Sequence, residues 1–253
     1  MVSVVFPAAG AGRRMRADRN KVFLELAEKP ILVHTLLKFS DCPSISELIV
    51  VVAAGEETYI EELLRGIHGL KPYRVATGGS ERQYSIANGL ELVDPAAEVI
   101  LVHDAARPLV SPETIENVIK TARCTGAAIA AVPEKYTVKI VDENRIVKDT
   151  IPRETLWEVQ TPQGFRRDIL YRAYQKAKED GFLGTDDASL VERMGVDVKV
   201  VESDYRNVKI TTPEDLLLAE ALLGDRTLSH AKGVAETALN FAAAKLKVKL
   251  HRT

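Results

Sequence analysis

Along the chain, short continuous runs of hydrophobic residues alternate with longer stretches in which hydrophobic positions recur with helical periodicity. This pattern predicts a repeating succession of strands and helices. Short runs rich in β-branched residues are typical of buried parallel strands. The expected strands cover residues 2–6, 47–53, 73–77, 98–103, 127–132, 197–203 and 207–211. Stretches with helical periodicity begin near residues 30, 56, 80, 111, 166, 185 and 212. This alternation predicts an α/β protein with a mostly parallel sheet in a three-layer arrangement.

Two of the expected helices carry clear start signals. Ser111 fits an N-cap, and Pro112 fits the first helical position, where a missing N–H costs nothing. Ser80 and Gln83 have the spacing of a capping box, so we expect Ser80 to cap the third helix. Both helices therefore begin directly after an expected strand and its loop.

Between residues 134 and 155 the pattern changes to the alternation of a β-hairpin around a turn at 142–144. A two-stranded ribbon is marginally stable alone in water, so its apolar residues need a cover. These residues are Val138, Ile140, Ile146 and Val147. The ribbon either forms an arm that packs on a second subunit or folds back onto its own sheet.

Composition places the chain among globular proteins. Its 253 residues are 46% hydrophobic and 28% charged, which suits one large domain that we expect to span residues 1–224. A net charge of −2 offers no general basic field for nucleic acid. No signal peptide or membrane-spanning run is found, and Cys42 and Cys124 lack motif spacing. The sequence therefore favours a cytoplasmic protein that binds neither nucleic acid nor membrane.

The C-terminal segment differs in charge from the rest of the chain. Residues 225–253 contain six lysines and arginines against two acidic residues. We expect a basic tail that is an appended helix or partly disordered. A basic helix that touches an anionic partner is the alternative.

The first loop, residues 7–21, carries the strongest candidate chemistry. Gly10 and Gly12 follow the first strand, where backbone N–H groups can approach an anion closely. Arg14 and Lys21 bring positive charge to the same place, which suits a polyphosphate. Ordinary turn chemistry is the alternative, because the three-glycine dinucleotide fingerprint and the P-loop are both absent.

A second candidate group follows the third strand. Gly79 and Ser80, with Arg82 and Ser85, allow close approach to a base or a sugar. The alternative is a plain turn before a helix. Neither interpretation is specific when the segment is considered alone.

Two further groups lie at later expected strand ends. Asp104 and Arg107 in HDAARP suit a ribose, a metal-bound phosphate or a substrate anion, or else pair with each other. Lys209 lies in an apolar expected strand, where burial requires an anionic partner. A phosphate is therefore the favoured partner of Lys209, and exposure on an edge strand is the alternative.

Seven motifs occur in an order that resembles one enzyme family. They are PAAGAGRRM, the lysine seven residues after Arg14, GGSERQYSI, HDAARP, the TP of VQTPQGF, TDDAS and NVKITTPEDLLLAE. Over residues 2–224 the chain resembles the 2-C-methyl-D-erythritol 4-phosphate cytidylyltransferases of the non-mevalonate isoprenoid pathway. The resemblance implies a Rossmann-like nucleotidyltransferase fold and a homodimer joined by exchange of a protruding β-hairpin arm. It also implies transfer of CMP from CTP to the substrate phosphate, with release of pyrophosphate and with Mg²⁺ held mainly by the CTP phosphates.

The same resemblance implies roles for individual residues. Arg14 and Lys21 match residues that stabilise the pentacoordinate α-phosphate, while Arg153 and Lys209 match those that position the attacking phosphate. The residues that match CTP contacts are Pro7, Ala8, Ala9, Gly10, Gly12, Gly79, Ser80, Ser85, Asp104 and Ala105. Those that match contacts to the second substrate are Arg107, Thr137 and Thr161, with Thr137 and Arg153 supplied by the partner's arm. No protein metal ligand is expected.

Some positions depart from the family pattern. Asn20 and Val22 stand where proline and glutamine are common, and Ser80 and Arg206 stand where acidic residues are frequent. No cation with an implied role is lost.

The implied chemistry agrees with the residue types. Transfer between phosphates needs positioning and cations rather than a protein nucleophile. A ribitol 5-phosphate cytidylyltransferase is the nearest alternative. A non-catalytic nucleotide-binding regulator is an alternative from a different class, and it would not need Arg153 and Lys209.

Overall fold

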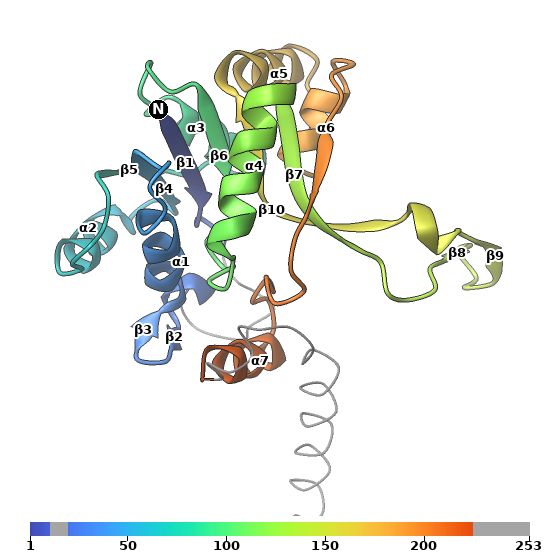
Figure 1. The fold of residues 1–253 in the computed structure, drawn as a ribbon, viewed down its shortest axis with the longest axis horizontal. Helices are drawn as coiled ribbons and strands as arrows, with labels where there is room; N and C mark the ends of the chain where they lie inside the picture. Colours follow the sequence, from blue (N-terminus) through green and yellow to red (C-terminus); the bar gives the residue numbers. More distant parts are fainter. Residues whose placement is uncertain (11–19, 225–253) are drawn as a thin grey trace, which may run out of the picture.

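A seven-stranded sheet forms the centre of the molecule in the computed structural model, which describes residues 1–10 and 20–224 (Figure 1). The strand order is β11-β7-β10-β6-β1-β4-β5, and every neighbouring pair is parallel except those that involve β10. The strands are β1 (Val2–Pro7), β4 (Glu47–Val52), β5 (Tyr73–Thr77), β6 (Val99–Val102), β7 (Ala127–Pro133), β10 (Trp157–Arg166) and β11 (Lys199–Glu202). The predicted mostly parallel sheet is confirmed.

Helices cover both faces of this sheet, because its central strands are apolar on both sides. All residues of β4 and β6 are buried, and Val4 in β1 is in register with Leu48 and Leu101 on either side. One apolar core contains side chains of α1, α2, α4 and α7, and a second core contains those of α3, α5 and α6. The helices are α1 (Ile31–Ser40), α2 (Glu57–Arg65), α3 (Arg82–Leu90), α4 (Pro112–Thr125), α5 (Arg167–Glu179), α6 (Asp187–Glu192) and α7 (Pro213–Gly224). The three-layer prediction is therefore confirmed.

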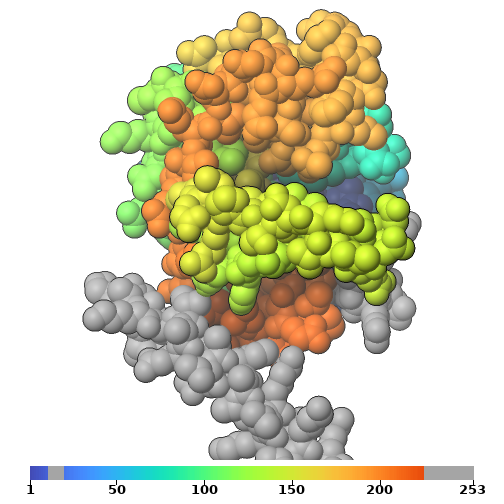
Figure 2. Space-filling view, turned by 90° about the vertical axis from the view of Figure 1, so that its right-hand side faces the viewer, coloured from blue at the N-terminus to red at the C-terminus, as the bar shows by residue number. Residues whose placement is uncertain are grey.

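A β-hairpin arm projects from the body and is continuous with the neighbouring strands β7 and β10 (Figure 1). It contains β8 (Lys139–Val141), β9 (Val147–Thr150) and the short helix η3 (Arg153–Thr155). In Figure 2 the arm lies across the front of the body as a yellow-green band. Ile140 and Ile146 are 47% and 58% exposed. The alternative in which the hairpin folds back onto its own sheet is therefore wrong.

Strand β10 was not predicted, because Pro162 and Gly164 interrupt its sequence. A β-bulge between Val159 and Gln163 accommodates the proline, which cannot donate to a ladder. A Cβ atom on Gly164 would come within 2.8 Å of side-chain atoms of Leu101 in β6 and Val118 in α4. The glycine is therefore explained by the close approach of α4 to this strand.

Two further local predictions are wrong. Glu81 rather than Ser80 occupies the N-cap of α3, and Gln83 instead donates to the carbonyl of Phe182 and accepts from the N–H of Gly184. Residues 207–211 form no strand. That segment is held as a loop, because the N–H of Ile210 donates to the carbonyl of Ala106 over 2.9 Å.

Several small elements complete the described chain. The short helix η2 (Lys21–Phe23) follows the first loop, and β2 (Glu25–Leu26) pairs with β3 (Lys29–Pro30) before α1. The N-cap at Ser111 with Pro112 behind it is confirmed. None of the helices in the described part of the chain has the length and apolar character needed to cross a bilayer. The predicted tail lies outside the described residues, so the boundary at residue 224 stays a prediction.

Candidate active site

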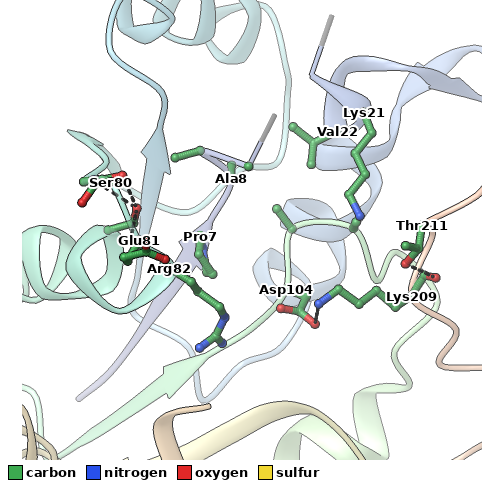
Figure 3. Close-up of a pocket in the computed structure, with 16 residues that line it drawn as sticks. Pro7, Ala8, Lys21, Val22, Ser80, Glu81, Arg82, Asp104, Lys209 and Thr211 are labelled. Carbon is green, nitrogen blue, oxygen red and sulfur yellow. Dashed lines mark hydrogen bonds and ion pairs between the residues drawn. The ribbon is translucent and has the colours of Figure 1, made fainter. Parts of the chain in front are cut away.

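A pocket of about 540 Å³ opens at the carboxyl ends of the parallel strands (Figure 3). Loops after β1, β5 and β6 line it, together with η2 and the segment before α7. The predicted site residues in its wall are Pro7, Ala8, Ala9, Gly10, Lys21, Gly79, Ser80, Ser85, Asp104, Ala105 and Lys209. Gly12 and Arg14 lie outside the described residues. The structure thus brings together every described residue that was predicted to contact CTP.

The floor of the pocket is built from two loops in tight contact. The N–H of Ala8 donates to Val51 and the N–H of Gly78 donates to Val52, both over 2.7 Å, so each loop is fixed to the end of β4. A Cβ atom on Gly78 would lie 2.5 Å from the Cβ of Ala9. Only glycine allows this approach, and the two loops form one continuous surface.

Ser85 holds the second loop against α3. Its Oγ accepts from the N–H of Gly79 over 3.1 Å and donates to the carbonyl of Glu81 over 3.0 Å. The hydroxyl therefore fixes residues 79–81 at the pocket wall rather than acting as a nucleophile.

A second wall carries a cluster of charges around Asp104. Its Oδ2 lies 2.9 Å from Lys209 Nζ and 3.2 Å from Arg107 Nε. Burial alone would raise the pKa of the Asp104 carboxyl, but Lys209, Arg107 and Arg82 outweigh burial and hold that pKa well below its usual range. The alternative in which Asp104 and Arg107 pair with each other is observed, and Lys209 also has an anionic partner in Asp104.

Lys21 reaches the same region from the short helix η2. Its Nζ donates to the carbonyl of Ile210 over 2.7 Å, directly beside Lys209 in sequence. In Figure 3 the Lys21 and Lys209 side chains come from separate elements and approach the same side of the pocket. Two cations thus line one pocket together with glycine-rich and alanine-rich loops, an arrangement that suits an anion.

The sequence and the fold of this chain match known proteins. The family model described as "IspD: 2-C-methyl-D-erythritol 4-phosphate cytidylyltransferase" matches residues 2–225. The chain belongs to this cytidylyltransferase family. Two cytidylyltransferase relatives, from Caldanaerobacter subterraneus subsp. tengcongensis and Alkaliphilus metalliredigens, are 48% and 49% identical. The matches cover 88% and 89% of this chain and 98% and 94% of the relatives.

Solved structures agree with the family assignment. The 4-diphosphocytidyl-2C-methyl-D-erythritol synthase of Anaerococcus prevotii superposes with a TM-score of 0.79 at 34% identity, over 89% of this chain and 96% of that one. The 2-C-methyl-D-erythritol 4-phosphate cytidylyltransferase of Thermus thermophilus gives 0.74 at 35% identity, over 88% and 98%. The Rossmann-like cytidylyltransferase fold implied by the motifs is therefore confirmed.

The residues predicted to contact the second substrate of this cytidylyltransferase are not gathered in the pocket wall. Thr161 and Arg107 are buried behind Asp104: the hydroxyl of Thr161 accepts from the Asp104 N–H, and Arg107 Nη1 donates to the carbonyl of Asn207. Thr137 is exposed on the arm, and Arg153 Nη1 donates to the carbonyl of Lys135 there. Their roles toward substrate stay predictions.

The sequence places Arg82 in the group after the third strand, but it assigns this cation of the cytidylyltransferase pocket no role of its own. Arg82 lines the wall, and its Nη2 lies 2.9 Å from Oδ2 of the fully buried Asp187. Asp187 also accepts a hydrogen bond from the hydroxyl of Tyr174 in α5. The GGSER motif supplied a signal for the arginine, but the partners lie about a hundred positions away and no local pattern indicates them.

The described residues of this cytidylyltransferase fit a Mg²⁺ ion that takes its ligands mainly from phosphate oxygens. No group of three or more His, Cys, Asp or Glu side chains that could hold a metal occurs at residues 1–10 or 20–224. The carboxylates in the pocket wall are Asp104, which is paired with two cations, and Glu81. Mg²⁺ commonly binds through few carboxylates together with substrate phosphates.

Replacing Gly78 by alanine is expected to weaken CTP binding by about 5- to 150-fold, because overpacking costs about 1–3 kcal/mol. The new methyl would push the Ala9 loop away from the floor of the pocket. Titration calorimetry with CTP measures the change. Gly66→Ala is the matched control, since its Cβ would meet only the Leu63 carbonyl at 3.7 Å. Unchanged affinity in the Gly78 variant would show that the two loops do not form the nucleotide floor.

The buried His103 is expected to make folding stability depend on pH. Burial lowers its pKa from 6.5 to about 3. The Arg107 carbonyl only accepts, so Nε2 carries the proton and Nδ1 accepts from the Thr161 hydroxyl. Between these two pKa values the unfolded chain binds a proton that the folded chain does not, so stability falls as pH decreases from 6.5 toward 3.

This dependence is measured by urea unfolding at several pH values. The contribution of His103 is at most about 1.4 kcal/mol per pH unit. The His103→Gln variant is expected to show a flatter profile, whereas His68→Gln, at an exposed position, keeps the wild-type profile. Equal slopes in wild type and His103→Gln would contradict the assignment.

Proposed function

We propose that this protein transfers CMP from CTP to 2-C-methyl-D-erythritol 4-phosphate. The products are 4-diphosphocytidyl-2-C-methyl-D-erythritol and pyrophosphate. The observation that carries the proposal is the approach of Lys21 and Lys209 to one pocket whose floor is made of the Ala8–Gly10 and Gly78–Ser80 loops. Membership of the cytidylyltransferase family supports the choice of nucleotide and acceptor.

In this proposal the nucleotide lies along the floor of the pocket. The cytosine packs against Gly79, Ser80 and Ser85, and the ribose lies near Asp104 and Ala105. Backbone N–H groups near Gly10 approach the phosphates, since a glycine there leaves open space. The triphosphate then extends toward Lys21, which donates to the α-phosphate where negative charge accumulates.

The transfer itself needs no protein nucleophile. An oxygen of the acceptor phosphate forms a new bond to the α-phosphorus of CTP. The bond between the α-phosphorus and the oxygen that bridges the α- and β-phosphates breaks, and pyrophosphate leaves with that oxygen. Lys209 orients the attacking phosphate, and Lys21 stabilises the equatorial oxygens. Mg²⁺, held mainly by the triphosphate oxygens, would neutralise part of the triphosphate charge.

The ion pair with Asp104 holds the Lys209 amino group at the pocket wall, where it can bind an anion. The Lys209 side chain is 41% exposed while Asp104 is largely buried, so the amino group remains open to a phosphate from the pocket side. Arg107 continues to balance the Asp104 charge when Lys209 turns toward substrate. Lys209 and Asp104 therefore each have a partner of opposite charge both with and without bound substrate.

The proposal includes a homodimer in which the arms are exchanged. The arm presents the apolar side chains Ile140, Val141, Ile146 and Val147 at about half exposure, which favours burial against a second subunit. It also carries Thr137 and Arg153, which would complete the partner's site. A two-fold arrangement buries the same surface on both subunits.

The proposal also places the enzyme in the cytoplasm. The two cysteines, Cys42 and Cys124, are free thiols rather than a disulfide. Unpaired cysteines suit a reducing compartment.

A pyrophosphate-release assay tests the activity. With CTP and Mg²⁺, release is expected with 2-C-methyl-D-erythritol 4-phosphate and not with ribitol 5-phosphate. A higher kcat/KM with ribitol 5-phosphate would favour the alternative cytidylyltransferase. Binding of CTP without release from either acceptor would favour a regulatory nucleotide-binding protein.

A further inference from the structure

Asn20 connects three separate segments beside the pocket without lining it. Its Nδ2 donates to the carbonyl of Ala8 over 2.6 Å and to Glu56 Oε2 over 3.4 Å. Its Oδ1 accepts from the N–H of Val22 over 3.4 Å, which caps the short helix η2. The side chain is buried, so these bonds form away from bulk water.

The orientation of the amide follows from its partners. The Ala8 carbonyl and the Glu56 carboxylate can only accept, so the amide nitrogen faces both of them and the oxygen faces Val22. Glu56 Oε2 is itself fixed by the N–H of Ala53 over 3.1 Å. Asn20 thus ties the end of β1, the start of η2 and the loop after β4 into one unit.

The residue after Asn20 is Lys21, on a turn that has little freedom to move. Val22 and Phe23 are buried, and the Phe23 ring packs edge-on against Tyr59 in α2 with centroids 5.2 Å apart. Lys21 Nζ is then placed 2.7 Å from the Ile210 carbonyl. The bond from Asn20 to Ala8 therefore joins the residue before Lys21 directly to the pocket floor.

We propose that Asn20 is a positioning residue for CMP transfer, which fixes the distance between the Ala8 floor and the Lys21 amino group. This inference rests on the proposed function. A donor acts on a transition state only when it is held at the correct place, and a shift of about 1 Å is enough to cost roughly 10²-fold in rate. Asn20 makes no contact with either substrate and acts through Lys21.

The first test is the Asn20→Ser variant. Serine is a good N-cap and keeps an acceptor for the Val22 N–H, but it lacks the amide that donates to Ala8 and Glu56. We expect kcat to fall about 10- to 100-fold, with a change in KM for CTP within about threefold. Wild-type kcat in this variant would overturn the proposal.

Asn88→Ser is the matched control. Asn88 also donates from Nδ2 to a backbone carbonyl, that of Thr77 over 2.9 Å, but at an exposed position in α3. We expect wild-type kcat in this control. An equal loss in both variants would show that the effect is not specific to Lys21, and would overturn the proposal.

The second test combines the change with Lys21→Ala. If Asn20 acts through Lys21, kcat of the double variant should lie within about twofold of kcat of Lys21→Ala alone. Once the lysine is absent, its position no longer matters, so the two effects are not additive. Losses that multiply would overturn the proposal. If Asn20→Ser does not fold, Asn20→Thr serves in both tests, because it also keeps a hydroxyl acceptor for the Val22 N–H and lacks the amide donor.

A crystal structure of the Asn20 variant separates this inference from the proposed function. We expect Lys21 Nζ to leave the Ile210 carbonyl, whatever reaction the wild type performs. Retention of that contact would overturn the inference alone. Absence of pyrophosphate release by the wild type would overturn the proposed function alone.

Discussion

Lys21→Ala is expected to lower kcat for CMP transfer by about 10²–10³-fold, the loss typical of one preorganised donor to a developing negative charge. The Lys21 amino group is fixed by the Ile210 carbonyl at the wall of the pocket, so it needs little reorganisation before it acts. The fold should persist, because Val22 and Phe23 supply the buried side chains of η2. Pyrophosphate release at saturating CTP and acceptor, together with the melting temperature, measures both quantities.

Lys120→Ala is a suitable control for this experiment. Lys120 is exposed on α4, so its removal changes the net charge equally without touching the pocket. Wild-type turnover is expected there. Wild-type turnover in Lys21→Ala would contradict the proposed role. The resemblance predicts a loss of similar size for Arg14→Ala, a position outside the described residues.

A mixed dimer of one Arg153→Ala subunit and one Lys21→Ala subunit should recover about half of the wild-type activity, since a two-fold dimer has two equivalent sites. Each variant is expected to be nearly inactive as a homodimer. With exchanged arms, one site of the mixed dimer receives both defects and the other receives neither. Differently tagged subunits, co-purified and assayed for pyrophosphate release, provide the measurement.

The matched control mixes Arg153→Ala with Thr137→Ala. Both changes lie on the arm, so every site in that dimer receives one defective arm and no recovery is expected. Recovery in both mixtures would indicate an effect of mixing alone. No recovery in the first mixture would mean that Arg153 serves the site of its own chain, and the proposed exchange would be wrong.

The sequence was informative about the fold where one physical effect dominates. Strands β1, β4 and β6 are buried on both faces, so their continuous β-branched runs follow directly from burial. The hairpin was visible because its alternation differs in period from the helices around it. Strand β10 was missed, because its proline is explained by a bulge and its glycine by a packed helix. Neither the bulge nor the approach of α4 can be inferred from the residues of β10 alone.

In the candidate site too, features set by the local sequence were predicted and features set by tertiary contacts were not. Glycines and cations at strand ends were predicted, and the pocket gathers the described ones. The need of Lys209 for an anionic partner was predicted, and the structure supplies Asp104, while the phosphate contact stays a prediction. The bonds from Asn20 to Ala8 and from Tyr174 to Asp187 link positions that no periodicity connects. Such contacts depend on the tertiary arrangement and cannot be predicted from a single sequence.

The contact between Lys21 and Ile210 has a consequence for synthesis on the ribosome. These residues are 189 positions apart, and the loop that carries Ile210 is itself held by Ala106 and followed by α7. Domains emerge from the ribosome N-terminal part first, so the central strands can begin to pack while this loop is still unmade. The nascent chain can thus become compact before it can place the Lys21 amino group against the Ile210 carbonyl, and a product that ends before residue 210 lacks this contact.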